Sequence, residues 1–163
     1  MPTSAFSRDK DDLTGPERVF ALMEGTWAVE RTIVPGGRFS GTATFEREGD
    51  DRLVYREKGV VDYDNFGRFT GERSYLYILA ADHIEVRFHD GTNAGQHFVD
   101  LLFAEAPDPG WPIVSVRDTH VCRLDNYETA YRFLSPDRFE ITYVVKGPAK
   151  DYISRSLFRR TGA

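Results

Sequence analysis

Glu57 and Arg73 are the two residues whose types and positions point most directly to chemistry. Each lies in a run of alternating residues, where successive side chains point to opposite faces of a strand. Glu57 then shares a face with Tyr55, and Arg73 shares a face with Tyr75 and Tyr77. If both faces point inward on adjacent strands, the two charges form a buried ion pair, which is costly unless each is satisfied by the other and by hydroxyl groups. Two roles stay open: a ligand-orienting or acid–base pair, and a structural salt bridge across a barrel.

A second group combines an imidazole and a thiol. His120 and Cys122 are two residues apart on one expected strand, which separates them by about 7 Å along that strand. A Cys–His nucleophile needs direct contact and an oxyanion hole, and no motif marks one. The alternative is a packed thiol beside a hydrogen-bonded imidazole. Two roles also stay open for Arg31, contact with a ligand and a structural ion pair. Tyr131 and Tyr143 add hydroxyl groups to the apolar faces of later strands.

The spacing of the cysteine and histidine residues does not indicate a metal site. The single cysteine excludes an internal disulfide and a multi-cysteine metal site. The four histidines lack a ligand spacing such as H-E-x-x-H: His97 and His120 lie on different expected strands, and His83 and His89 are interpreted as turn and surface residues. The sequence therefore predicts no metal site and no obligatory cofactor.

Length and charge limit the class of protein. The chain has 163 residues, which suits one domain, with residues 1–13 as a polar tail and 14–163 as the folded part. Its net charge is -5, and the basic residues are scattered, so neither nucleic acid nor a membrane surface is an expected partner. No apolar run resembles a signal peptide or a membrane span, and we expect a cytoplasmic protein. The sequence does not indicate an oligomeric state.

The elements that would hold these residues are nearly all strands. Short alternating runs are separated by turn signals, a pattern typical of an all-β barrel or sandwich. Successive antiparallel strands without helical crossovers favour a closed up-and-down barrel, with a β-sandwich as the alternative. One short helix precedes them, with Thr14, Pro16 and Glu17 as a start signal and Gly25 as its expected end. The pattern predicts about ten strands, over residues 27–33, 39–47, 52–62, 68–79, 83–88, 96–103, 113–122, 127–134, 139–146 and 150–159.

Several motifs carry a family resemblance. Gly25-x-Trp27 behind a short helix, with Arg159 and Arg160 ending the last strand, is similar to the signature of lipocalin-like (calycin) barrels. The chain from about 20 to 160 also resembles a bacterial family of lipocalin-like proteins known as a domain of unknown function. This second resemblance rests on Tyr55-x-Glu57-x-Gly59, Arg73-x-Tyr75, His120-x-Cys122-x-x-Asp125-x-Tyr127 and Gly147-Pro148-x-Lys150-Asp151-Tyr152.

The resemblance implies a particular closed end and, in some relatives, a cofactor. In lipocalin-like barrels the Trp, here Trp27, lies at the closed end, and an Arg from the last strand packs across it. Some such barrels, the nitrobindins among them, hold haem through one His. His120 or His97 would serve here.

The function expected from this fold is binding of a small molecule. A barrel of about ten strands is wider than its side chains fill, so its interior normally holds water or a ligand. We expect a partly apolar ligand with a polar or anionic group, its body against Phe45, Phe133 and Tyr143. Alternatives are a hydrolase or isomerase using His120, Glu57 and the tyrosines, a haem protein, and an interaction module on an outer sheet face. The expected ligand contacts are Arg31, Tyr55, Glu57, Arg73, Tyr75, Tyr77, His120, Cys122, Tyr131 and Tyr143.

Overall fold

A computed structural model of the chain describes residues 15–103, 115–122, 125–148 and 150–162, with the side chains of 115–122 and 125–127 left out. The expected tail, residues 1–13, lies outside this part. The described elements are a helix, α1 (Pro16–Met23), and the strands β1 (Gly25–Val34), β2 (Gly37–Arg47), β3 (Arg52–Tyr63), β4 (Gly67–Leu79), β5 (His83–Phe88), β6 (His97–Phe103), β7 (Ser115–Cys122), β8 (Asp125–Ser135), β9 (Arg138–Lys146) and β10 (Asp151–Arg160). A three-residue 3-10 turn, η2 (Gly91–Asn93), joins β5 to β6.

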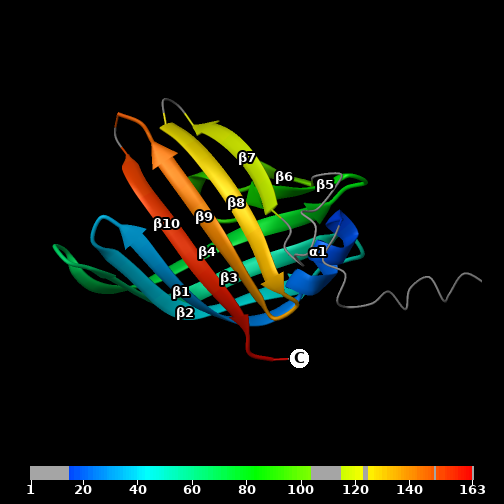
Figure 1. The fold of residues 1–163 in the computed structure, drawn as a ribbon, viewed down its shortest axis with the longest axis horizontal. Helices are drawn as coiled ribbons and strands as arrows, with labels where there is room; N and C mark the ends of the chain where they lie inside the picture. The colour runs from blue at the N-terminus through cyan, green and yellow to red at the C-terminus, as the bar shows by residue number, and fades with distance from the viewer. Residues whose placement is uncertain (1–14, 104–114, 123–124, 149, 163) are drawn as a thin grey trace, which may run out of the picture.

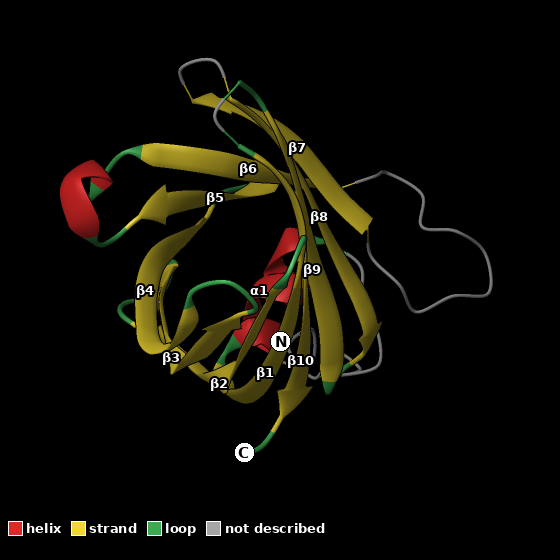
Figure 2. Cartoon of the chain, turned by 90° about the vertical axis from the view of Figure 1, so that its left-hand side faces the viewer, coloured by secondary structure: helices red, strands yellow, loops and turns green. Residues whose placement is uncertain are grey.

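The strands form one closed barrel in which each is antiparallel to its neighbours (Figures 1 and 2). Each strand pairs with the next along the chain, and β1 closes the ring against β10. The shortest described strand pairing is the one between β6 and β7. It comprises Leu102 with Arg117 and Phe103 with Val116. The predicted barrel is therefore confirmed, and the alternative of a sandwich is wrong.

Helix α1 covers one end of the barrel and buries its apolar face there, through Val19, Phe20, Leu22 and Met23. It differs from the expectation at both ends. Gly15 is the N-cap and has no side chain that could cap the helix, and Thr14, which the start signal included, lies outside the described residues. Gly25 opens β1 instead of ending the helix, with Glu24 between them.

Trp27 and Arg160 connect the helix with the first and last strands. The guanidinium carbon of Arg160 lies 4.3 Å from the centroid of the Trp27 ring, as the resemblance implies. Arg160 also donates hydrogen bonds to the carbonyls of Leu22 and Glu24 at the end of α1. The Trp27 indole donates to the carbonyl of Met23 at 2.9 Å. These bonds satisfy helix carbonyls that have no partner within the helix.

The half of the barrel next to α1 is packed with aromatic side chains. Phe139 stacks on Phe158 with ring centroids 4.4 Å apart, and Trp27 meets Phe139 edge-on at 4.8 Å. Phe45 and Phe133 are 1% exposed in the same cluster. Among the described side chains, these rings fill the half of the barrel next to α1, and the opposite half contains a cavity.

A row of glycines shapes the wall of the hollow half. Gly41, Gly59 and Gly71 are register partners across β2, β3 and β4. A Cβ atom on Gly41 would lie 2.3 Å from the carbonyl oxygen of Lys58, so the two strands approach too closely there for any other residue. Because these glycines have no side chains, they also leave space on the inner face of the barrel, where Gly71 lines a cavity.

Candidate functional site

A cavity of about 420 Å³ opens at the end of the barrel opposite α1. Strand pairs β1–β2, β3–β4 and β9–β10 surround it. Its wall is largely apolar, with a small polar group on its floor, as is usual for a small-molecule site. The apolar and aromatic part of the wall comprises Ile33, Pro35, Phe39, Val61, Tyr63, Phe69 and Tyr152, and the polar part includes Arg31, Glu57, Glu72, Arg73, Tyr143 and Ser154.

Three charged side chains from three strands meet on the cavity floor. Arg31 binds Glu57 through two parallel contacts of 2.8 Å, from Nη1 to Oε2 and from Nη2 to Oε1. Arg73 adds a third contact from Nε to Oε2 of Glu57 at 3.0 Å. On β2, Gly41 lies between the register partners of Arg31 and Glu57, so no side chain stands in the path that Arg31 takes to the carboxylate.

Hydroxyl groups complete this charged cluster. The Tyr55 hydroxyl donates to Oε1 of Glu57, and Nε of Arg31 donates to the Ser156 hydroxyl at 2.6 Å. Burial alone would raise the pKa of Glu57, but the bonds from Arg31, the nearby charge of Arg73 and the Tyr55 bond hold that pKa at about 2. Glu57 is therefore ionised near neutral pH and unsuited to proton transfer there.

The interior tyrosines form a second, uncharged network beneath the cavity. The hydroxyls of Tyr77 and Tyr131 lie 2.6 Å apart, and Tyr143 lies close enough to both to influence the pKa of each. Burial is the largest cause that raises the pKa of all three phenols well above the ordinary value. Each phenol therefore stays protonated, and the network supplies polarity without charge.

The predicted site residues separate into three groups. Arg31, Glu57, Arg73 and Tyr143 line the cavity. The second group consists of buried residues that pack beneath it and are not on its wall: Tyr55, Tyr75, Tyr77 and Tyr131, together with Phe45 and Phe133. The third is the pair His120 and Cys122 on β7, whose side chains lie outside the described part of the structure.

The sequence did not indicate two features of the site. The predicted partner of Glu57 was Arg73 alone, whereas Arg31 makes the bidentate contact. Only the register of β1, β2 and β3 reveals this, since the two residues are 26 positions apart. In addition, His97 lies on the exterior of β6 and is exposed, so its side chain does not point into the barrel as a haem ligand there would.

The charge on the cavity floor favours an anion. Two guanidinium groups face one ionised carboxylate, which leaves one net positive charge. Glu72, also on the wall, lies 3.5 Å from Lys58, and this exposed pair contributes no net charge. Arg73 donates Nε to Glu57 and Nη1 to the Tyr75 hydroxyl at 3.3 Å. No described residue accepts from its Nη2.

The fold and this site define a lipocalin-like β-barrel with a half-filled interior. The chain belongs to a family of unknown function (DUF6314), whose model matches residues 23–160. The expected barrel fold and the expected family of unknown function are thus confirmed; that the barrel is a calycin and that the family is bacterial stay predictions. A search among curated proteins finds no match in sequence.

Solved structures resemble this chain at low sequence identity, and one with a TM-score above 0.5 shares its fold. The S-type phycobiliprotein lyase CPES from Guillardia theta has 12% identity and a TM-score of 0.66, covering 94% of this chain and 96% of that one. A fluorescence-activating β-barrel designed de novo has 16% identity and a TM-score of 0.49, with 88% and 97% covered. No helix in the described part of the chain is long and apolar enough to cross a membrane.

Proposed function

We propose that the chain binds a small, partly apolar anion in the open-end cavity. The observation that carries the proposal is the guanidinium of Arg73, which is one-third exposed and lines the cavity. Its Nη2 is not used by the described residues. A charge-assisted hydrogen bond from this nitrogen to a carboxylate or a similar group would be stronger than one between neutral groups.

The cavity walls supply the remaining binding free energy. Phe39, Val61, Phe69 and Ile33 would remove the apolar body of the ligand from water, at about 25 cal/mol per Å² of buried apolar area. Tyr143 and Ser154 offer further polar contacts for orientation. Arg31 has the supporting role of holding Glu57, which in turn holds Arg73.

The proposal requires little rearrangement on binding. Arg31 and Glu57 are fixed by hydrogen bonds to each other, to Ser156 and to Tyr55, so the positive site exists before a ligand arrives. Preorganisation of this kind lowers the entropy lost on binding. Reversible binding is favoured over acid–base catalysis by Glu57, because a pKa of about 2 leaves that carboxyl ionised near neutral pH, and burial raises the pKa of Tyr55, Tyr77, Tyr131 and Tyr143 well above the ordinary value.

Native mass spectrometry of the protein purified from its own host tests this proposal. We expect a native mass above the denatured mass, by the mass of a small molecule, and loss of that adduct in Arg73→Gln. The matched control is Arg68→Gln, which removes an equal charge from an exposed pair with Asp62 outside the cavity. The control should keep the adduct. A bare native mass for the wild type, or an adduct that both variants retain, would count against the proposal.

A further inference from the structure

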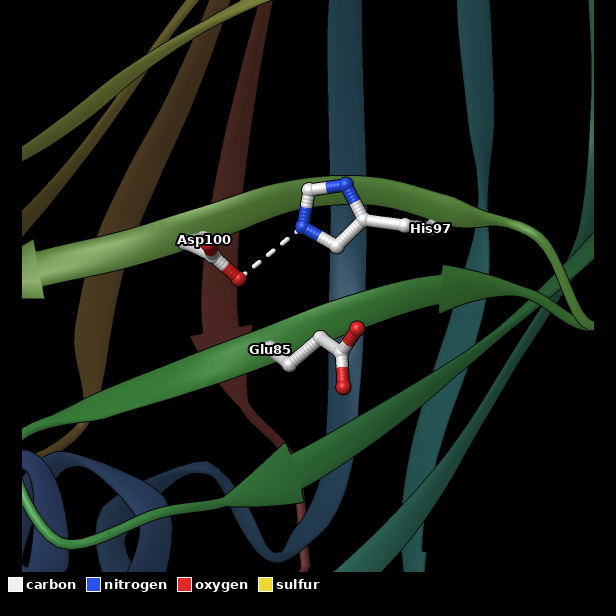
Figure 3. Close-up of side chains that lie close together, drawn as sticks. All are labelled: Glu85, His97 and Asp100. Atoms are coloured by element: carbon white, nitrogen blue, oxygen red, sulfur yellow. Dashed lines mark hydrogen bonds and ion pairs between the residues drawn. The ribbon is translucent and has the colours of Figure 1, made fainter.

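A cluster of metal-ligand side chains lies on the exterior of the barrel, on β5 and β6, away from the cavity. One ligand atom from each of Glu85, His97 and Asp100 can be chosen so that all three lie within 4.8 Å of one another. Figure 3 shows the three side chains on the two adjacent strands, with His97 and Asp100 turned toward each other. Nε2 of His97 is 2.9 Å from Oδ1 of Asp100.

A fourth candidate ligand, His83, faces the same carboxylate oxygen. Its Nε2 lies 3.9 Å from Oδ1 of Asp100. Strand alternation explains the grouping: Ile84 and Val86 are buried, so His83 and Glu85 share the outer face of β5. Glu85 is the register partner of Asp100 on β6, which brings both imidazoles and both carboxylates to one outer patch.

A hydrogen bond to Asp82 fixes the orientation of the His83 ring, as a carboxylate commonly does for a histidine that binds a metal. Oδ1 of Asp82 lies 2.8 Å from Nδ1 of His83. An ionised carboxylate only accepts, so Nδ1 carries the proton, and in the neutral ring Nε2 presents a lone pair. That lone pair then faces an oxygen of Asp100, which also only accepts. A proton on Nε2 or a cation between the two atoms would resolve this arrangement, and a carboxylate behind a metal-bound His is a frequent supporting contact.

We propose that His83, His97, Asp100 and Glu85 form a divalent-cation site of the zinc class. Two imidazoles and two carboxylates suit a tetrahedral zinc ion with bonds of about 2.0 to 2.2 Å. Such a site needs its ligand atoms roughly 3.4 Å apart. His83 lies outside the group of three, and the four side chains are between one-fifth and one-half exposed on an outer surface, so side-chain rotation would have to bring the four ligand atoms to this spacing.

Arg87 provides a built-in test, because it competes for one ligand. Its Nε lies 3.2 Å from Oε2 of Glu85, and it would have to release that carboxylate to the metal. Removing its charge should therefore tighten zinc binding by roughly 3- to 10-fold, given Coulomb interactions at this range near the surface. A change that merely damaged the fold would not increase affinity.

Isothermal titration of zinc chloride into the full chain and its variants tests the site. The wild type should bind one equivalent. His97→Ala and His83→Ala should each weaken binding at least 10-fold, and Asp82→Asn should weaken it by roughly 10- to 100-fold, as expected for a supporting partner. Arg87→Gln should tighten it, and His89→Ala, which removes an imidazole outside the cluster, should leave it unchanged.

Three outcomes would overturn the proposal. They are a wild type that takes up no zinc at micromolar concentration, His97 and His83 variants with wild-type affinity, and a His89 variant that loses as much as they do. Far-ultraviolet circular dichroism of each variant checks that the barrel is intact, since all the substituted side chains lie outside it.

Discussion

Arg31 and Glu57 form a bidentate ion pair inside the barrel, with both nitrogen–oxygen distances at 2.8 Å and both side chains less than one-tenth exposed. Arg73 shares the same carboxylate. The arrangement is costly to assemble because three charges leave water, and it persists because each has an ionic or hydroxyl partner.

Replacing Glu57 by Gln should destabilise the protein strongly. Two guanidinium groups would then lie together without a counter-charge, and breaking a buried pair in this way costs about 3 to 5 kcal/mol. Urea denaturation measures the change in free energy of unfolding. Glu46→Gln is the matched control, since Glu46 lies 3.8 Å from Arg56 in an exposed pair, and its loss should cost less than about 1 kcal/mol. Equal small losses in both variants would contradict the account.

The Glu57 carboxyl should titrate far below its ordinary range. Its pKa falls from 4.5 to about 2 in the folded protein. A lowered folded-state pKa contributes stability above the unfolded-state pKa near 4.5, and this contribution is lost as pH falls through the folded value near 2. The difference corresponds to about 3 kcal/mol. Carbon-13 NMR of the labelled carboxyl should give a midpoint near 2, and a midpoint near 4.5 would show that the ion pairs have little effect.

The hydroxyls of Tyr77 and Tyr131 should be energetically coupled. Either single change to Phe leaves a buried hydroxyl without one partner, at a cost of about 1 to 3 kcal/mol. The double change Tyr77→Phe/Tyr131→Phe removes both hydroxyls and should cost clearly less than the sum of the single changes. The measurement is a double-mutant cycle: chemical denaturation gives the free energy of unfolding of the wild type, the two single variants and the double variant. Strict additivity would mean that the 2.6 Å contact contributes nothing to stability.

The barrel could be predicted because its signals are local. Alternation of side chains and turn residues set nearly every strand within two residues of its observed bounds. Alternation alone left the inner face of β4 open, the tyrosine face was predicted by analogy with the neighbouring strands, and the burial of Tyr75 and Tyr77 confirms it. The ends of helix α1 were predicted less accurately than the strands, since the geometry of a helix end depends on how the helix meets β1.

The site was only partly predictable because it depends on long-range register. Nothing within β1 alone shows that Arg31 reaches past Gly41 to Glu57; the stagger of three strands decides it. Which half of the barrel stays hollow depends on the packing of rings such as Phe139 and Phe158 against α1. The cluster of His97 and Asp100 with β5 was missed for a related reason, because a register shift between Val86 and Arg87 sets that pairing.

The central claim is that Arg73 makes the cavity selective for an anion with an apolar body. The most direct measurement compares the affinities of octanoate and octanol, which share a chain and differ in charge, by isothermal titration. The wild type should prefer octanoate by about 10- to 100-fold, the equivalent of one charged hydrogen bond, and Arg73→Gln should abolish the preference while Arg68→Gln keeps it. Equal binding of the two probes to the wild type, or a preference that survives in Arg73→Gln, would contradict the account.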